Sequence, residues 1–263
     1  MSTIPLVGLT KPFKKPVREV GSFIALSLDT FVQLLHPPFF WREFIGQCWF
    51  IARVSTFPAI AQAVAFNGMV VFLFGVAAVS FGAGDITGAA SGLATISQIG
   101  PVTTVFVLSG AAATAMCADL GSRTIREEID AMRVLGIDPI HRMVVPRVVA
   151  LLVMGILLNG VVCISGLSAD YAFAVYALHC NPGAFASSLT LLTNAPTMIV
   201  SFLKAAVFGV LAGLIACYKG LSAGGGAQGV GNAVNETVVF TFMALLIANI
   251  IISVLTATTT LAT

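Results

Sequence analysis

The fold class is decided by the stretch V-V-A-L-L-V-M-G-I-L-L-N-G-V-V-C-I-S-G-L-S-A, residues 148–169. These 22 residues lie between Arg147 and Asp170 and contain no charged side chain. A helix of about 20 apolar residues is long enough to cross the hydrocarbon core of a bilayer. The whole chain is 58% hydrophobic and 9% charged, with a mean hydropathy of +1.00, so it lacks the charged surface of a water-soluble domain. We therefore predict an all-α integral membrane protein.

Four further apolar runs predict four further spans. They lie near residues 57–82, 96–118, 196–218 and 237–261. Together with 148–169 they make five transmembrane helices, which occupy about 57–261 of a single domain over residues 1–263. The five cysteines show no C-x-x-C spacing and most fall inside these runs, so we interpret them as small core residues.

The distribution of Lys and Arg orients the five spans. Six of these residues lie in the N-terminal segment 1–53, and five arginines lie between the second and third spans. The loops 83–95 and 170–195 contain neither residue type. Because cytoplasmic loops carry the excess of Lys and Arg, we expect the N-terminus and the charged loop on the cytoplasmic side of the plasma membrane. The C-terminus is then outside.

The N-terminal segment contains a predicted amphipathic helix. Its apolar face holds Val20, Phe23, Ile24, Phe31 and Leu35, and its polar face holds Glu19, Ser22, Asp29 and Gln33. A helix of this kind lies in the membrane interface and does not span it. We expect it to end at His36-Pro37-Pro38. The aromatic residues that follow are suited to the depth of lipid headgroups: Phe39, Phe40, Trp41 and Trp49.

The segment between the second and third spans is unusually charged. From Arg123 to Arg147 it holds nine of the 24 Asp, Glu, Lys and Arg residues of the chain. Thr124 and Glu127 have the spacing of a capping box, and Gly136 is a typical helix stop. These signals predict a short helix of roughly 11 residues within 124–136. It could lie on the lipid surface or dock into a cytoplasmic partner. Its mixed charges favour the partner, because a helix made for anionic lipid would be mainly basic.

Three segments occur in the order found in one family of membrane proteins. They are T-I-R-E-E-I-D-A-M-R-V-L-G-I-D-P at 124–139 with V-V-P-R-V-V-A at 144–150, F-L-K-A-A-V-F-G-V-L-A-G-L-I-A-C-Y-K-G at 202–220, and G-G-G-A-Q-G-V-G-N-A-V-N-E-T-V-V at 224–239. With these segments the chain resembles the permease subunits of the MlaE/YrbE family, and most of all its actinobacterial YrbE branch. The resemblance runs from the interfacial helix to the last span.

The resemblance implies a function and a set of partners. Members are membrane subunits of ABC-type lipid transporters that work with MCE proteins on the outer side, here in the import of a fatty acid, a sterol or another lipid. Two permease chains pair, either as a homodimer or as a heterodimer with a sister YrbE chain. A cytoplasmic ATPase, which binds ATP and Mg, docks on the short coupling helix within 124–136. This chain has no G-x-x-x-x-G-K-[ST] motif, so we expect it to bind no cofactor and to be no enzyme.

The resemblance also implies which residues of the coupling helix face the ATPase. They are Arg126, Glu127, Glu128, Asp130, Met132 and Arg133, with Met132 as an apolar anchor. The chain departs from the family in its second span, where many members carry an arginine. The corresponding stretch L-S-G-A-A-A-T-A-M, residues 108–116, has no charge, so no role of that arginine is transferred.

Isolated polar and small residues within the spans allow further expectations. Lys204 lies inside the fourth span, where it could snorkel to the interface or contact a lipid headgroup, a carboxylate or a polar partner in a cavity. Gly209 and Gly213 form a G-x-x-x-G pair for close helix packing, within the chain or across a dimer. We interpret Asp85 and Asp170 as charges at the outer helix ends.

Several classes of function have little support in the sequence. Gly224, Gly226 and Gly229 match G-x-G-x-x-G, but no strand precedes them, so we expect a flexible cytoplasmic loop. The spans lack a central acidic residue, which argues against a secondary transporter driven by an ion gradient. A structural adaptor for an extracellular complex is the other alternative. A net charge of +2 gives no support for nucleic-acid binding, and no residue cluster suggests a metal site.

Overall fold

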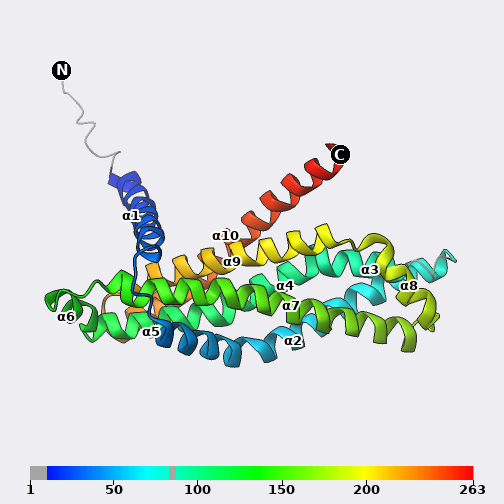
Figure 1. Cartoon of the computed structure of the whole chain (residues 1–263), viewed down its shortest axis with the longest axis horizontal. Coiled ribbons are helices and arrows are strands. Elements are labelled where there is room, and N and C mark those ends of the chain that lie inside the picture. The colour runs from blue at the N-terminus through cyan, green and yellow to red at the C-terminus, as the bar shows by residue number, and fades with distance from the viewer. Residues whose placement is uncertain (1–10, 83–86, 263) are drawn as a thin grey trace, which may run out of the picture.

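A computed structural model describes residues 11–82 and 87–262, which form helices and short connections without a strand. The helices are α1 (Lys11–Leu34), α2 (Trp41–Ser80), α3 (Thr87–Ala94), α4 (Gly100–Val107), α5 (Thr114–Ile125), α6 (Glu128–Val134), α7 (Val145–Tyr176), α8 (Pro182–Leu192), α9 (Ala195–Leu221) and α10 (Gly226–Ala262). Three π-helical segments, η3 (Thr95–Ile99), η4 (Leu108–Ala113) and η5 (Ile140–Val144), continue the neighbouring helices. The longer helices form an elongated bundle with α6 at one end and α8 at the other (Figure 1). Asp85 lies outside the described residues.

Five helical stretches of the described chain are long and apolar enough to cross a membrane. They are Trp41–Ser80, Thr87–Ile125, Ile140–Tyr176, Ala195–Leu221 and Gly226–Thr258. The predicted all-α membrane fold with five spans is therefore confirmed. Most of these stretches are much longer than the predicted spans, because charged residues such as Arg53, Asp119 and Arg147 were used as limits of the predicted spans although the helices continue past them. The third has 37 residues and is about 55 Å long, although the hydrocarbon core is only about 30 Å thick.

The interior of the bundle is formed by contacts between helices that are distant in sequence. Helix α7 packs along both α2 and α9, and α10 packs on α9 and α5. Small residues allow α9 to approach α7 closely. A Cβ atom at Gly209 would overlap the backbone of Leu151, and one at Gly213 would lie 3.1 Å from the Cα of Val148. The G-x-x-x-G pair therefore packs inside this chain.

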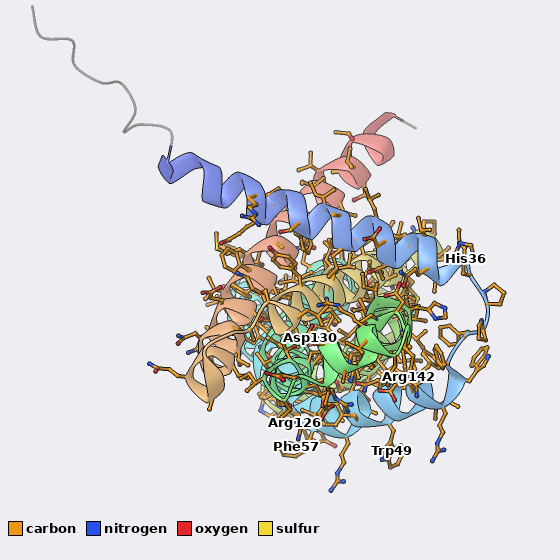
Figure 2. The ribbon with its side chains drawn as sticks, turned by 90° about the vertical axis from the view of Figure 1, so that its left-hand side faces the viewer. His36, Trp49, Phe57, Arg126, Asp130 and Arg142 are labelled. Atoms are coloured by element: carbon orange, nitrogen blue, oxygen red, sulfur yellow. The ribbon has the colours of Figure 1, made fainter. Side chains whose placement is uncertain are left out.

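Helix α1 lies crosswise to the long axis of the bundle (Figures 1 and 2). It ends at Leu34, just before the predicted stop at His36. Phe23 packs edge-on against Tyr218 of α9, with 5.6 Å between the ring centroids. The other apolar residues of the predicted face are exposed: Val20, Ile24, Phe31 and Leu35. This leaves an apolar surface free along a helix that runs across the bundle, as expected for an interfacial helix.

Helix α10 begins inside the bundle and leaves it toward its C-terminal end (Figure 1). Its first residue is Gly226, so the predicted loop around Gly224–Gly229 is largely helical and the fifth span starts earlier than residue 237. Gly225 and Gly226 have positive φ angles of 84° and 75°, and these angles let the chain turn from α9 into α10. Large apolar side chains along the projecting half are exposed: Ile247, Ile250, Ile251, Val254 and Leu255.

Asp170 is not the exposed helix-end charge that we predicted. It lies inside α7 and is wholly buried. Its Oδ2 accepts a hydrogen bond from the Thr95 hydroxyl at 2.7 Å, and that hydroxyl also lies 2.7 Å from the side-chain oxygen of Asn67. The interpretation was wrong because a tertiary partner from η3 reaches Asp170, which no local pattern could indicate. The sequence argument against an ion-driven carrier concerned only acids at the centre of a span, and Asp170 lies in the last two turns of α7.

Candidate functional site

The charged end of the bundle, which faces the viewer in Figure 2, is built around α6. The predicted capping box does not form. Thr124 lies in the last turn of α5, where its hydroxyl donates to the Leu120 carbonyl at 2.9 Å and lies 3.3 Å from the Gly220 carbonyl. Glu127 adopts a left-handed conformation with φ 59° and separates α5 from α6. The predicted helix at 124–136 is therefore the end of α5, a sharp turn, and a seven-residue α6.

The end of α6 agrees with the prediction. Gly136 has a φ angle of 75°, which a residue with a side chain adopts only at a cost. Its N–H donates to the Arg133 carbonyl at 3.1 Å, and the N–H of Ile137 donates to the Met132 carbonyl at 2.9 Å. This pair of hydrogen bonds is the Schellman arrangement, which satisfies the last carbonyls of a helix.

Helix α6 has an inward and an outward side. Ile129 is buried, and Met132 is half-buried against the same cluster of apolar side chains. The predicted anchor Met132 thus packs at least partly on its own bundle. The outward side holds Asp130, paired with Arg133 at 2.9 Å, while the next residues, Val134 and Leu135, are 88% and 74% exposed.

Val134 and Leu135 were not predicted as site residues. They lie outside the apolar pattern of the predicted helix, which Ile125, Ile129 and Met132 form at i, i+4 and i+7. Two neighbouring large apolar side chains at the tip of a charged element, far from the apolar spans, are typical of a protein contact.

A chain of ion pairs runs from α6 into the bundle, and we call it the charge chain. Its members are Arg126, Glu128, Arg123, Asp119, Arg147 and Glu43. Each member is paired with the next in that order, and the five successive nitrogen-to-oxygen distances are 3.1, 3.8, 3.2, 2.5 and 3.6 Å. Four members, Arg123, Asp119, Arg147 and Glu43, were not predicted as site residues. The charge chain links the turn before α6 to α5, α7 and α2.

Arg147 is the buried member of the charge chain. Its side chain has no exposed surface, its Nη1 donates to the Met143 carbonyl at 2.9 Å, and its Nη2 contacts Asp119. A buried guanidinium is costly unless its charge is paired; here the charge is paired, although the buried Nε has no hydrogen-bond partner among the described residues. The V-V-P-R-V-V-A motif contained the signal for this residue, since an arginine between six apolar residues needs an acidic partner.

Lys204 forms a second polar site, deep between the spans. It is 2% exposed, so it does not snorkel to an interface. Its Nζ donates to the Ser97 carbonyl at 3.0 Å and to the Ser253 hydroxyl at 2.8 Å. Within the described residues no carboxylate lies within ion-pair distance of it. An ammonium has three N–H donors, so one is left for a further acceptor.

Among the cavities that adjoin the spans in the described part of the chain are the following two. One of about 370 Å³ lies beside Lys204 and is lined by residues of η3, α9 and α10, among them Gln98, Thr197 and Ser253. The other has about 390 Å³ and lies between α2 and α3, with an almost wholly apolar lining that includes Val70, Phe74 and Ala90.

Five spans with cavities between them, and an exposed charged helix at one end, define a multi-pass membrane permease. The family model described as Permease MlaE matches residues 44–255, and the chain belongs to this family. A probable ABC transporter permease protein of Rickettsia felis is 30% identical over 240 residues, which cover 91% of this chain and 92% of that protein. A probable ABC transporter permease protein of Synechocystis is 34% identical over 238 residues, 90% of this chain and 89% of that protein.

A plant protein extends the range of relatives. The chloroplastic protein TRIGALACTOSYLDIACYLGLYCEROL 1 of Arabidopsis thaliana is 34% identical over 164 residues, 61% of this chain and 46% of that protein. As a permease of the ABC-transporter type, this chain is a membrane subunit. Such permeases work with a separate ATPase and with a second permease chain.

Proposed function

We propose that this chain is the permease subunit of an ATP-driven lipid transporter in the plasma membrane, with the α6 end in the cytoplasm. The orientation follows from the five arginines between the second and third spans. The lipid cargo is supported by membership of the MlaE family and by the lipid that the name of the Arabidopsis relative contains. In line with the resemblance to the YrbE branch, the transporter imports its lipid and works with MCE proteins on the outer side.

The observation that carries the proposal is the connection between α6 and the interior of the bundle. The outward side of α6 offers charges of both signs, Asp130 and Arg133, next to exposed Val134 and Leu135. An ATPase that holds this surface also acts on the charge chain, which leads to the buried Arg147. ATP and Mg bind in that partner, and its movement would be transmitted to α2, α5 and α7 as rigid elements.

The cargo site that we propose combines burial of acyl chains with a positive charge. Apolar cavity walls stabilise hydrocarbon at about 25 cal/mol per Å² of buried surface. Lys204 has a free donor and no carboxylate partner in the described part of the chain, so it is suited to an acidic headgroup.

A second permease chain completes the assembly. The projecting half of α10 exposes Ile247, Ile250 and Ile251, which share one face of the helix at i, i+3 and i+4. A pair of chains that met at this helix would enclose a larger cavity than one bundle holds. The pair is a homodimer or a heterodimer with a sister chain.

Affinity purification of the tagged chain in mild detergent, followed by mass spectrometry of bound proteins and lipids, tests the proposal. We expect an ATPase, MCE-type proteins and a lipid; partners without any ATPase would favour a structural adaptor instead. Charge reversal by Glu127→Lys with Asp130→Lys should release the ATPase and leave membrane insertion intact. Glu19→Lys on α1 is the matched control, since Glu19 is also an exposed acid. An unchanged amount of ATPase on the α6 variant contradicts docking at this helix.

A further inference from the structure

We infer that the α6 end carries a binding site for the phosphate group of an anionic phospholipid, separate from the cargo cavities. The site is a cavity of about 600 Å³ where α2 begins, and we call it the arginine pocket. Its lining residues are Phe39, Phe40, Trp41, Arg42, Glu43, Arg123, Arg142 and Met143. The lipid that it holds stays in its leaflet, so this inference goes beyond the proposed function and needs only that the α6 end faces the cytoplasm.

The charges of the arginine pocket do not cancel. Glu43 lies 3.6 Å from the buried Arg147, and Arg123 is held by acidic members of the charge chain. Arg42 and Arg142 are exposed, and neither has an acidic partner within the described residues. The Arg142 guanidinium lies 5.2 Å from the centroid of the Phe40 ring, which restricts its position. Two guanidinium groups are therefore free to bind an anion.

The start of α2 adds to this positive potential. The helix has 40 residues, its first residue is Trp41, and no side chain caps its N-terminus. Unpaired N–H groups at such an end favour a negative charge. Arginines bind phosphate oxygens through paired N–H groups, so the pocket suits a headgroup whose phosphate charge is not neutralised by a cation of the same headgroup.

An apolar stripe below the arginine pocket favours a lipid over a free phosphate or an acidic protein segment. Trp41, Ile45 and Trp49 follow one another at i, i+4 and i+8 on α2 and are 65%, 61% and 72% exposed. Figure 2 shows Trp49 pointing away from the bundle, on the same side of the molecule as Phe57 further along α2. Acyl chains can lie along this stripe while the phosphate reaches the arginines. Tryptophans at headgroup depth and basic pockets on the cytoplasmic side are features of such sites.

The test uses the full chain in nanodiscs of equal parts phosphatidylglycerol and phosphatidylcholine. The protein is then released from the nanodiscs, and the lipids that stay bound to it are counted by native mass spectrometry. We expect the wild-type protein to retain phosphatidylglycerol preferentially. The variant Arg42→Gln with Arg142→Gln should reduce this preference roughly 30-fold, the factor expected for two interfacial arginines. Arg18→Gln is the control, because Arg18 is an exposed arginine of α1 outside the pocket.

The possible results separate the inference from its rivals. No lipid preference in the wild-type protein, or an equal loss in the Arg18→Gln control, would overturn it. Full displacement of the lipid by millimolar glycerol phosphate would assign the pocket to a free phosphate. Loss of the ATPase from the double variant with unchanged lipid retention would assign the two arginines to a protein contact. Because lipid retention is measured without nucleotide or ATPase, failure of the proposed transport function leaves this result unaffected.

Discussion

Substitution of Asp119 by alanine tests whether the charge chain holds the bundle together. The change removes the closest partner of Arg147, whose side chain has no exposed surface. Removal of one member of a buried ion pair costs about 3–5 kcal/mol, because the remaining charge is buried without compensation. The side chain of Asp119 is 37% exposed, and Glu43 remains 3.6 Å from Arg147. We therefore expect the lower end of the range, about 3 kcal/mol.

The assay is thermal unfolding of the purified chain in detergent, followed by circular dichroism. For a protein of this size a loss of about 3 kcal/mol lowers the Tm by about 6 to 12 °C. The control is Asp130→Ala, which removes a pair with Arg133 at 2.9 Å in which the side chains are 70% and 65% exposed. An exposed pair contributes at most about 1 kcal/mol, so its Tm should change little.

A double variant separates burial of charge from loss of a contact. Arg147→Met removes the buried charge and leaves Asp119 its pair with Arg123 at 3.2 Å. Once Arg147 is methionine, the further change Asp119→Ala should cost less than about 1 kcal/mol. Additive effects of the two substitutions, or equal shifts in Asp119→Ala and Asp130→Ala, would refute the reasoning.

Three further substitutions test other parts of the structure. Leu135→Asp should release the ATPase in pull-down assays and change stability by less than about 0.5 kcal/mol, because the side chain is 74% exposed; full retention would exclude this tip from docking. Gly209→Val should cost about 2–3 kcal/mol in thermal unfolding through overlap with Leu151, whereas Gly110→Ala, with open space around it, should not. Lys204→Met should lower co-purified acidic lipid about tenfold while the fold persists; unchanged lipid in quantitative mass spectrometry would remove Lys204 from the cargo site.

The number and type of the long helices could be predicted from the sequence, because an uncharged run of 22 residues such as 148–169 has few alternatives. Their ends could not be predicted. Arg147 was used as the limit of a span, yet it lies within α7 and is buried because Asp119 neutralises it from 28 residues away. Whether a charge ends a span depends on a partner that only the tertiary structure supplies.

The start of the short helix α6 could not be predicted from the sequence either, because it also depends on tertiary contacts. Thr124 can cap a following helix or bond the carbonyl of a preceding turn, and both are compatible with the local sequence. Packing of α5 against Gly220 of α9 selects the second arrangement. Gly136 was predicted correctly, since a positive φ angle at a helix end is a property of the residue itself. The exposure of Val134 and Leu135 follows only from the position of α6 on the bundle.

The length of the third span has a mechanical consequence. Its helix, from Ile140 to Tyr176, is about 55 Å long, nearly twice the thickness of the hydrocarbon it crosses. If such a rod pivots by about 10° near the α8 end, its other end sweeps sideways by about 10 Å. A stroke of that size at the α6 end would therefore produce only ångström-scale adjustments beside the pivot, and the rod would act as a reduction gear that turns a large movement at one end into a small one at the other.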